Sequence, residues 1–262
     1  TWRHSATEKL YRTTSNEILM KVLGIIPARY ASSRFPGKPL IDLKGKSMIQ
    51  RVYEGASKSN SLTKIVVATD DQRIVNEVLR FGGNVCLTNE AHQSGTDRCA
   101  EVAALNPGFD VVINIQGDEP LVNPLQLDQL LSAFSHSDVS IATLGIPTSD
   151  EADLLNPNRI KIVLDHQENA LYFSRSCVPN SHHFKGEYLS NYPFLRHIGL
   201  YAYRANTLAQ ICQLTPTALE KMESLEQLRW MYYGYSIKVV QTTIETPNID
   251  TPEDVENVLL FL

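Results

Sequence analysis

The 262-residue chain predicts an α/β fold: a mostly parallel, Rossmann-like sheet with helices on both faces and an antiparallel extension or arm. Two observations on the sequence and one general rule support this. Short runs rich in Val and Ile, typical of buried strands, alternate with helical patterns along most of the chain. Such strand–helix–strand units join parallel strands by right-handed crossovers. Hydrophobic residues make up 43% and charged residues 20% of the sequence, which excludes a disordered or fibrous protein.

Apolar runs and helical periodicity assign the elements in order. Strands are expected at residues 22–28, 64–69, 111–116, 139–144, 161–164 and 237–241. Helices are expected at 47–57, 71–81, 125–134 and 224–233, and a further helix begins near Ser94. The last helix is expected to begin at Thr251, because Thr suits the N-cap and Pro252 the first helical position.

The alternation breaks between about 147 and 204, where helices are few and a Pro- and His-rich loop occurs. We therefore expect one domain over 21–262, with 147–204 as an antiparallel arm on it. Residues 1–20 are polar and lack a clear period, and Met20 is a candidate natural start. They are either an extension or cloning remnant, or a genuine terminal arm, and the sequence favours neither.

Composition excludes several functional classes. The net charge is −5, from 24 basic and 29 acidic residues, and no stripe of Lys and Arg suggests a nucleic-acid partner. No run of about 18 apolar residues predicts a membrane-inserted helix. The four cysteines form no CxxC pair and have no zinc-ligand spacing, as is typical of a reduced compartment. With no visible signal peptide, a cytoplasmic protein is expected.

Neither of the two common glycine motifs for binding nucleotides is present. The sequence contains no GxGxxG, so a dinucleotide site is not supported. Gly45-Lys46-Ser47 imitates the end of a P-loop, but the first glycine of that motif would fall at Leu40. We interpret these three residues as a turn leading into a helix.

The loop after the first strand is the strongest candidate site. Arg29, Arg34 and Lys38 lie in one loop at the carboxyl end of a strand, where ligands bind in parallel sheets. Arg recognises phosphate oxygens in a bidentate way, and Lys supplies a point charge. A solvated basic loop is the alternative. The Ser and Gly residues among these cations favour a site for a triphosphate.

Two aspartates are candidates for holding a metal. Asp118 follows the strand expected at 111–116, and Asp250 precedes the last helix. Magnesium is usually held by one or two carboxylates plus substrate phosphates. The alternatives are a turn-forming Asp118 and a helix-capping Asp250, and the pair can act together only if the fold joins them.

The stretch IIPARYASSRFPGKPL resembles the opening signature of the sugar-acid cytidylyltransferases, especially those that act on 3-deoxy-manno-octulosonate (Kdo). Six further blocks follow in the order of that family and cover nearly the whole chain after Met20: HQSGTDR, NIQGDEP, ALYFSR, LRHIGLYAYR, LEQLRW and IDTPEDVE. The set together is far more specific than any one block. The resemblance implies a nucleotidyltransferase sheet and a homodimer, with residues 147–204 contributing to the sugar site and the dimer contact.

The resemblance also implies roles for individual residues. Asp118 and Asp250 would hold Mg²⁺, and Arg29, Arg34, Lys38 and Asp118 would be catalytic. CTP would be bound by Pro27, Ala28, Arg29, Ser33, Arg34, Lys38, Ser94, Gly95, Arg98 and Gln116. The sugar acid would be bound by Gln116, Arg175, His197, Tyr201, Glu226 and Gln227. For the Ser94 block and for Glu226-Gln227, a plain N-cap and a solvated helix face are the respective alternatives.

The implied reaction is CTP plus Kdo giving CMP-Kdo and pyrophosphate, a step in bacterial lipopolysaccharide biosynthesis. The anomeric hydroxyl would attack the α-phosphorus directly, which depends mainly on positioning and charge neutralisation. No protein general base is evident in the sequence. Two alternatives remain open: a cytidylyltransferase for another sugar acid, such as a sialic acid, and a non-catalytic nucleotide-binding protein on this fold.

Overall fold

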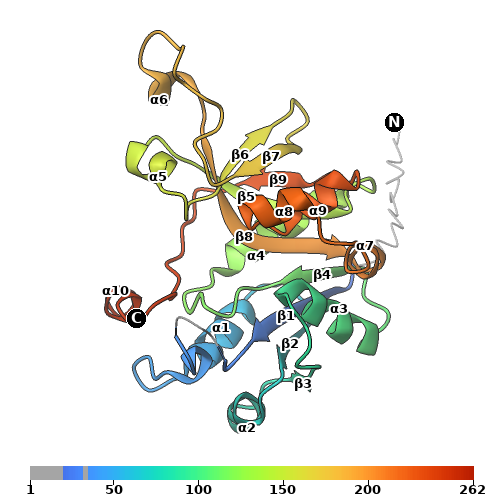
Figure 1. The fold of residues 1–262 in the computed structure, drawn as a ribbon. Helices are drawn as coiled ribbons and strands as arrows, with labels where there is room; N and C mark the ends of the chain where they lie inside the picture. Colours follow the sequence, from blue (N-terminus) through green and yellow to red (C-terminus); the bar gives the residue numbers. More distant parts are fainter. Residues whose placement is uncertain (1–19, 32–34) are drawn as a thin grey trace, which may run out of the picture.

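The computed structural model describes residues 20–31 and 35–262, and these form a single nine-stranded sheet with helices packed on it (Figure 1). The main path of the sheet runs β3-β2-β1-β4-β8-β5-β9, with β6 and β7 attached beside β8. The strands are β1 Val22–Ala28, β2 Lys64–Thr69, β3 Val85–Leu87, β4 Val111–Asn114, β5 Ile141–Pro147, β6 Lys161–Leu164, β7 Ala170–Ser174, β8 Leu195–Arg204 and β9 Lys238–Gln241.

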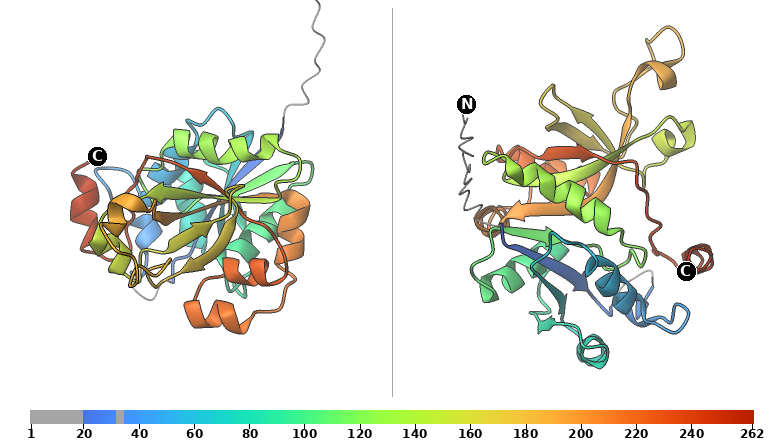
Figure 2. Two further views of the ribbon diagram at one scale, coloured as in Figure 1. Left: turned by 90° about the horizontal axis from the view of Figure 1, so that it is seen from above. Right: turned by 180° about the vertical axis from the view of Figure 1, so that it is seen from behind.

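Helices cover both faces of the sheet. They are α1 Met48–Ala56, α2 Gln72–Arg80, α3 Gly95–Leu105, α4 Pro124–Ser132, α5 Glu151–Leu155, α6 Tyr188–Asn191, α7 Ala205–Ile211, α8 Ala218–Glu223, α9 Gln227–Tyr232 and α10 Asp254–Leu259. Short 3₁₀ turns lie at η1 Lys38–Leu40 and η2 Ala133–Ser135. Figure 2 shows α1 and α4 together on the face seen from behind.

Alternation along β1 divides the interior into two apolar layers. Val22 and Ile26 pack with buried residues of α1, α2 and α4, whereas Leu23 and Ile25 pack with those of α3, α7 and α9. Successive side chains of a strand point to opposite faces, so a strand that is apolar throughout must be covered on both. The predicted α/β class with helices on both faces is confirmed.

Local capping explains where several helices begin. The Ser47 side chain accepts from the backbone N–H of Gln50 and starts α1, which is the turn-to-helix role expected for the Gly-Lys-Ser sequence. Ser94 and Asp97 form a reciprocal capping box at the start of α3. The helix expected over 224–233 begins later, at α9, because Ser224 adopts a left-handed φ of 51° that ends α8.

Strand β8 is antiparallel to both of its neighbours in the main path, β4 and β5. The other main pairings are parallel: β1 with β2 and β4, β2 with β3, and β5 with β9. This corrects the boundary expected for the arm at 147–204, because its last ten residues form a central strand of the sheet. The part that projects from the body carries α6 (Figure 1).

The parallel strands place their carboxyl ends on one edge of the sheet. Strands β1 and β4 are neighbours, so the loops that follow Ala28 and Asn114 lie side by side. Within the described ranges, no helix combines the length and the apolar character needed to cross a bilayer.

Candidate active site

The loop that leaves β1 presents two described cations at this edge. Arg29 follows the last residue of the strand, and its guanidinium donates to the backbone carbonyl of His92. Lys38 begins the 3₁₀ turn η1, where Gly37 precedes it with a φ of +74°. The loop is closed by a hydrogen bond from the Gly37 N–H to the Tyr30 carbonyl, 2.9 Å long. The predicted residues Ser33 and Arg34 lie outside the described residues.

The loop after β4 packs directly against this first loop. A Cβ on Gly117 would lie 2.5 Å from the carbonyl oxygen of Pro27, so only glycine allows the two backbones to come this close. The preceding residue, Gln116, donates from its side-chain amide to the Gly199 carbonyl at 2.5 Å. Close packing of the two loops brings Asp118 next to Lys38.

Lys38 lies between the two predicted metal-binding carboxylates. Its ammonium nitrogen is 3.0 Å from Asp118 Oδ2 and 3.7 Å from Asp250 Oδ1. It also donates to the carbonyl of Ile249 at 2.6 Å, and the Ile249 N–H donates to the Asp118 carbonyl at 2.9 Å. These contacts bring together two aspartates that are far apart in the chain. The fold therefore joins Asp118 and Asp250, as a shared metal site requires.

Asp250 is not the cap of the last helix. Helix α10 begins at Asp254, and not at Thr251 as the Thr-Pro pattern predicted. The Asp254 carboxylate accepts from the backbone N–H groups of Asp250 and Thr251 at 2.9 and 2.8 Å. The Asp254 side chain therefore holds the turn that carries Asp250, and the Asp250 carboxylate faces Lys38 instead.

The donor set fits a hard divalent cation. Two carboxylates converge on a point that a positive ammonium occupies, so the local field already favours a cation. Nowhere in residues 20–31 and 35–262 do three or more His, Cys, Asp or Glu side chains gather as a metal cage. Magnesium sites of phosphate-transferring enzymes commonly use one or two carboxylates together with substrate phosphates.

Two hollows meet at these aspartates. One, of about 390 Å³, is lined by residues of the first loop, including Pro27, Ala28, Arg29 and Lys38. The other, of about 280 Å³, extends along β8 and includes His197 in its lining. Gln116, Asp118 and Asp250 line both hollows. The arrangement provides two neighbouring compartments with carboxylates at their junction and cationic side chains in the lining of each.

His197 is the clearest of the predicted sugar-site residues in the second hollow. Burial lowers the pKa of its imidazole to about 3, so the ring is neutral at physiological pH. Its Nε2 lies 2.9 Å from the Thr143 hydroxyl, and its ring centroid is 5.3 Å from that of Tyr201. The two rings are therefore neighbours on β8, although a register shift in the β5–β8 pairing lies between them.

Apart from His197 and Gln116, the predicted sugar-site residues lie outside the lining of this hollow. Tyr201 packs edge-on against Trp230, and Gln227 is 5% exposed with an amide nitrogen that makes no hydrogen bond within the described residues. The Glu226 carboxylate accepts from the Thr96 hydroxyl at 2.6 Å, and burial raises its pKa. The Arg175 guanidinium donates to three backbone carbonyls, those of Glu223 at 2.6 Å and Ser224 at the end of α8 and that of Pro157 after α5.

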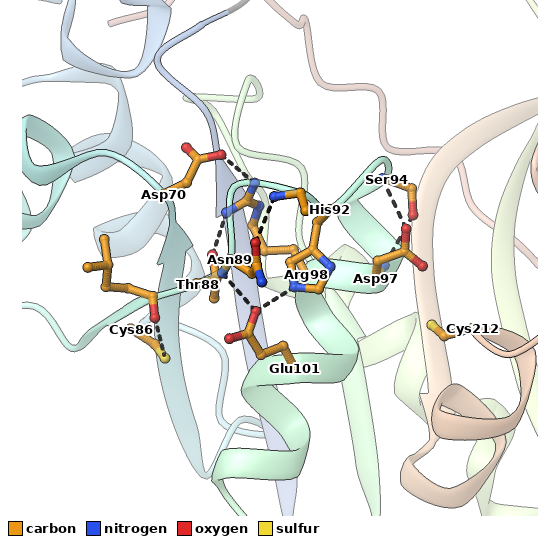
Figure 3. Close-up of polar contacts among 12 residues, drawn as sticks. Asp70, Cys86, Thr88, Asn89, His92, Ser94, Asp97, Arg98, Glu101 and Cys212 are labelled. Atoms are coloured by element: carbon orange, nitrogen blue, oxygen red, sulfur yellow. Dashed lines mark hydrogen bonds and ion pairs between the residues drawn. The ribbon is translucent and has the colours of Figure 1, made fainter.

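The predicted nucleotide-binding residues at the start of α3 lie in two different environments. Ser94 caps the helix and Gly95 lies close to Pro27, so both are near the first hollow. Arg98 is fully buried; it donates to the Thr88 hydroxyl and, at 2.6 Å, to Asp70 (Figure 3). This differs from the predicted contact of Arg98 with the nucleotide. Its side chain instead ties α3 to the segments that follow β2 and β3.

Several residues that line the second hollow were not among those predicted from the sequence. They include Arg159, Arg196, Glu245 and Thr246. Arg196 directly precedes His197 on β8 and forms an ion pair with Glu245 at 2.5 Å. Glu119 also lines the hollow; burial and the neighbouring Asp118 charge raise its pKa to about 7. The only sequence feature that could have indicated Glu119 is its position next to Asp118.

Comparison with known proteins identifies the family of the chain. The profile of the cytidylyltransferase family matches residues 23–239. A 3-deoxy-manno-octulosonate cytidylyltransferase of Parabacteroides distasonis is 53% identical over 93% of this chain and 99% of its own. An 8-amino-3,8-dideoxy-manno-octulosonate cytidylyltransferase of Shewanella pealeana is 48% identical over 90% of this chain and 96% of its own. A solved CMP:2-keto-3-deoxy-manno-octonic acid synthetase complexed with CTP superposes with a TM-score of 0.86 and 40% identity, covering 92% of this chain and 98% of that one. The chain belongs to the cytidylyltransferase family.

Proposed function

We propose that the protein transfers the cytidylyl group of CTP to Kdo, giving CMP-Kdo and pyrophosphate for lipopolysaccharide biosynthesis. The observation that carries this proposal is the junction of two hollows at Asp118 and Asp250. A nucleotide in the first hollow and a sugar acid in the second would meet at the carboxylates. The relatives in the comparison act on the same kind of acceptor.

The first hollow supplies cations for the triphosphate. Arg29 and Lys38 would contact the phosphate oxygens and neutralise the charge that develops on the leaving pyrophosphate. Magnesium held by Asp118 and Asp250 would neutralise the α-phosphate and lower the pKa of the attacking hydroxyl. Lys38 would then move its ammonium from the carboxylates toward the phosphates, because a cation between the aspartates repels it.

The second hollow orients the sugar acid. The neutral ring of His197 would form a hydrogen bond with a sugar hydroxyl and add no charge near the carboxylates. The Gln116 amide, tied to the Gly199 carbonyl, lies at the junction and would position the anomeric carbon. The anomeric oxygen would attack the α-phosphorus while the bond to the pyrophosphate oxygen breaks, and the hydroxyl proton passes to solvent.

A second acceptor deserves a test because the Shewanella pealeana relative is named for 8-amino-3,8-dideoxy-manno-octulosonate. The two sugars differ only at the end of the chain, where one carries a hydroxyl and the other an amine. Identity to the Kdo-named and the amino-sugar-named relatives is similar, at 53% and 48%. We favour Kdo, and a direct comparison of the two acceptors decides the question.

Pyrophosphate release with each of the four nucleoside triphosphates and a panel of sugar acids tests the proposal. CTP with Kdo should be the best pair, and release should require a divalent cation. Equal turnover with ATP would refute the assignment of the base. Binding of CTP without turnover of any sugar acid would favour a non-catalytic nucleotide-binding protein.

We further propose a cytoplasmic homodimer in which the arm that carries α6 contacts the second copy. A cavity of about 110 Å³ on this arm is lined by aromatic side chains such as Tyr188 and Phe194, and the nearby Phe184 is 53% exposed. Phe194 is buried, whereas Phe184 presents an aromatic ring at the surface beside this cavity, and aromatic side chains are enriched in protein contacts. Sedimentation as a monomer at micromolar concentration would contradict this proposal.

A further inference from the structure

We propose that Arg73, on α2, is a positioning residue that holds the phosphate loop ready for CTP by stacking on Tyr30. This inference rests on the proposed function, because it assigns a task to the loop that carries Arg29 and Lys38. Arg73 lines neither hollow at the carboxylates, and it lies in a segment that the sequence indicated only as an ordinary amphipathic helix.

The Tyr30 ring lies between Arg73 and Gly37. The guanidinium carbon of Arg73 is 3.2 Å from the centroid of the ring. At Gly37, a Cβ would lie 3.2 Å from the ring, so glycine leaves just enough room for the tyrosine. Because Gly37 also donates its N–H to the Tyr30 carbonyl, side-chain and backbone contacts join the two ends of the loop.

Arg73 is itself held in place before any ligand binds. Its Nε and Nη2 atoms donate to the two carboxylate oxygens of Asp71 at 2.9 and 2.6 Å. Asp71 also accepts from the backbone N–H of Arg73 and caps α2. The helix is anchored by the buried residues Ile74 and Val78. A planar guanidinium in a two-point ion pair has little freedom to leave the ring, so the stack is preorganised.

The stack restrains the backbone next to Arg29 and Lys38, because its two contact points adjoin these residues in the sequence. Tyr30 follows Arg29, and Gly37 precedes Lys38. Fixing the ring between α2 and Gly37 therefore fixes both backbone positions from which the cations project. Without the stack, CTP binding itself would have to fix these two positions, and this cost would weaken the affinity for CTP. The chemical step in the bound complex should change less, because the cations reach the same phosphates once CTP is bound.

Arg80 provides a matched control on the same helix. It is 59% exposed, against 57% for Arg73, and its Nε and Nη2 donate to the Glu77 carboxylate at 2.7 Å each. Its guanidinium also donates to the side-chain carbonyl of Gln50 on α1, and the cation that stacks on Tyr30 is Arg73 instead. Arg73→Met and Arg80→Met thus remove the same charge from the same helix, and only the first removes the stack.

The experiment measures the dissociation constant of CTP by calorimetry, together with KM, kcat and Tm. Arg73→Met should weaken CTP binding by about two- to five-fold, the range expected for one exposed cation–π contact, with a smaller change in kcat. Arg73→Lys should give an intermediate shift, and Arg80→Met should match the wild type. The combination of Arg73→Met with Tyr30→Leu should cost less than the product of the two single effects.

The outcomes separate the stack from the proposed function. If the wild-type protein binds CTP and the Arg73→Met variant binds it equally well, the positioning role is wrong and the proposed function still stands. Multiplicative effects of the Arg73→Met and Tyr30→Leu changes would also overturn it, because residues that act through their contact cannot be independent. Failure of the wild-type protein to bind CTP would overturn the proposed function first.

Discussion

Replacing Lys38 by Met should destabilise the protein, and the loss of stability should be smaller with magnesium than without it. At an effective dielectric constant of about 20, the ammonium gains roughly 5.5 and 4.5 kcal/mol of gross attraction from the carboxylates at 3.0 and 3.7 Å. Dehydration of the side chain, which is 12% exposed, cancels most of this. Because Asp118 and Asp250 remain 28% and 36% exposed, we expect a net loss of about 2 kcal/mol without metal.

In a protein of this size, that loss corresponds to a Tm lower by about 4–8 °C. Millimolar Mg²⁺ should narrow the difference, since the divalent cation replaces the missing ammonium between the carboxylates. Turnover should nevertheless fall by about 10²–10³-fold, because the triphosphate loses a cation. Differential scanning fluorimetry in EDTA and in a Mg²⁺ series measures the stability effect, and pyrophosphate release measures turnover.

Lys46→Met is the matched control. Lys46 forms an ion pair with Glu54 at 2.5 Å, but its side chain is 43% exposed and lies away from both aspartates. We expect a change within about 0.5 kcal/mol and no special response to magnesium. A Lys38→Met protein with an unchanged Tm in EDTA, or with a magnesium response no larger than that of Lys46→Met, would refute this reasoning.

Three further predictions concern the same site. Asp118→Asn and Asp250→Asn should each reduce turnover, and the double variant should lose far less than the product of both losses, because the two carboxylates serve one cation; independent losses across a magnesium titration would place them in separate sites. Glu119 has a pKa raised from 4.5 to about 7, chiefly by burial, so its contribution to stability is complete below pH 4.5 and is lost as the pH rises through 7. Glu119→Gln should therefore gain Tm relative to the wild type, in EDTA, as the pH rises from 5 to 8, and parallel curves would contradict this. The ring of His197, with its pKa lowered to about 3, contributes stability that is present above pH 6.5 and declines as the pH falls toward 3; its NMR signals should not titrate above pH 5, and a ring pKa near 6.5 would be inconsistent with its burial.

The sequence predicted those features that depend on local pattern. The apolar runs at β1 and β2 give the strands with the same bounds, because a strand covered on both faces must be apolar throughout. The cations of the first loop follow from their position after such a strand. The resemblance of the motifs then indicated the family, which the comparisons confirm.

Features that depend on tertiary contacts were not available from the sequence. The meeting of Asp118 and Asp250 requires the backbone bond from Ile249 to Asp118. The Thr-Pro pattern at 251 satisfied the rules for a helix start, but the Asp254 carboxylate binds the N–H groups ahead of it and the helix begins later. Arg98 belongs to a motif associated with the nucleotide, yet it is buried because Asp70 and Thr88 offer it partners inside.

The central position of β8 has a consequence for how the chain folds. Strand β8 pairs with β4, about 90 residues earlier in the sequence, and with β5, and it lies between them. Without residues 195–204, the main path of the sheet divides into two parts, β3-β2-β1-β4 and β5-β9, each with an open, apolar edge. Such edges pair readily with other chains. Refolding at high protein concentration should therefore lose yield to aggregation, because the two parts stay open until this one strand joins them.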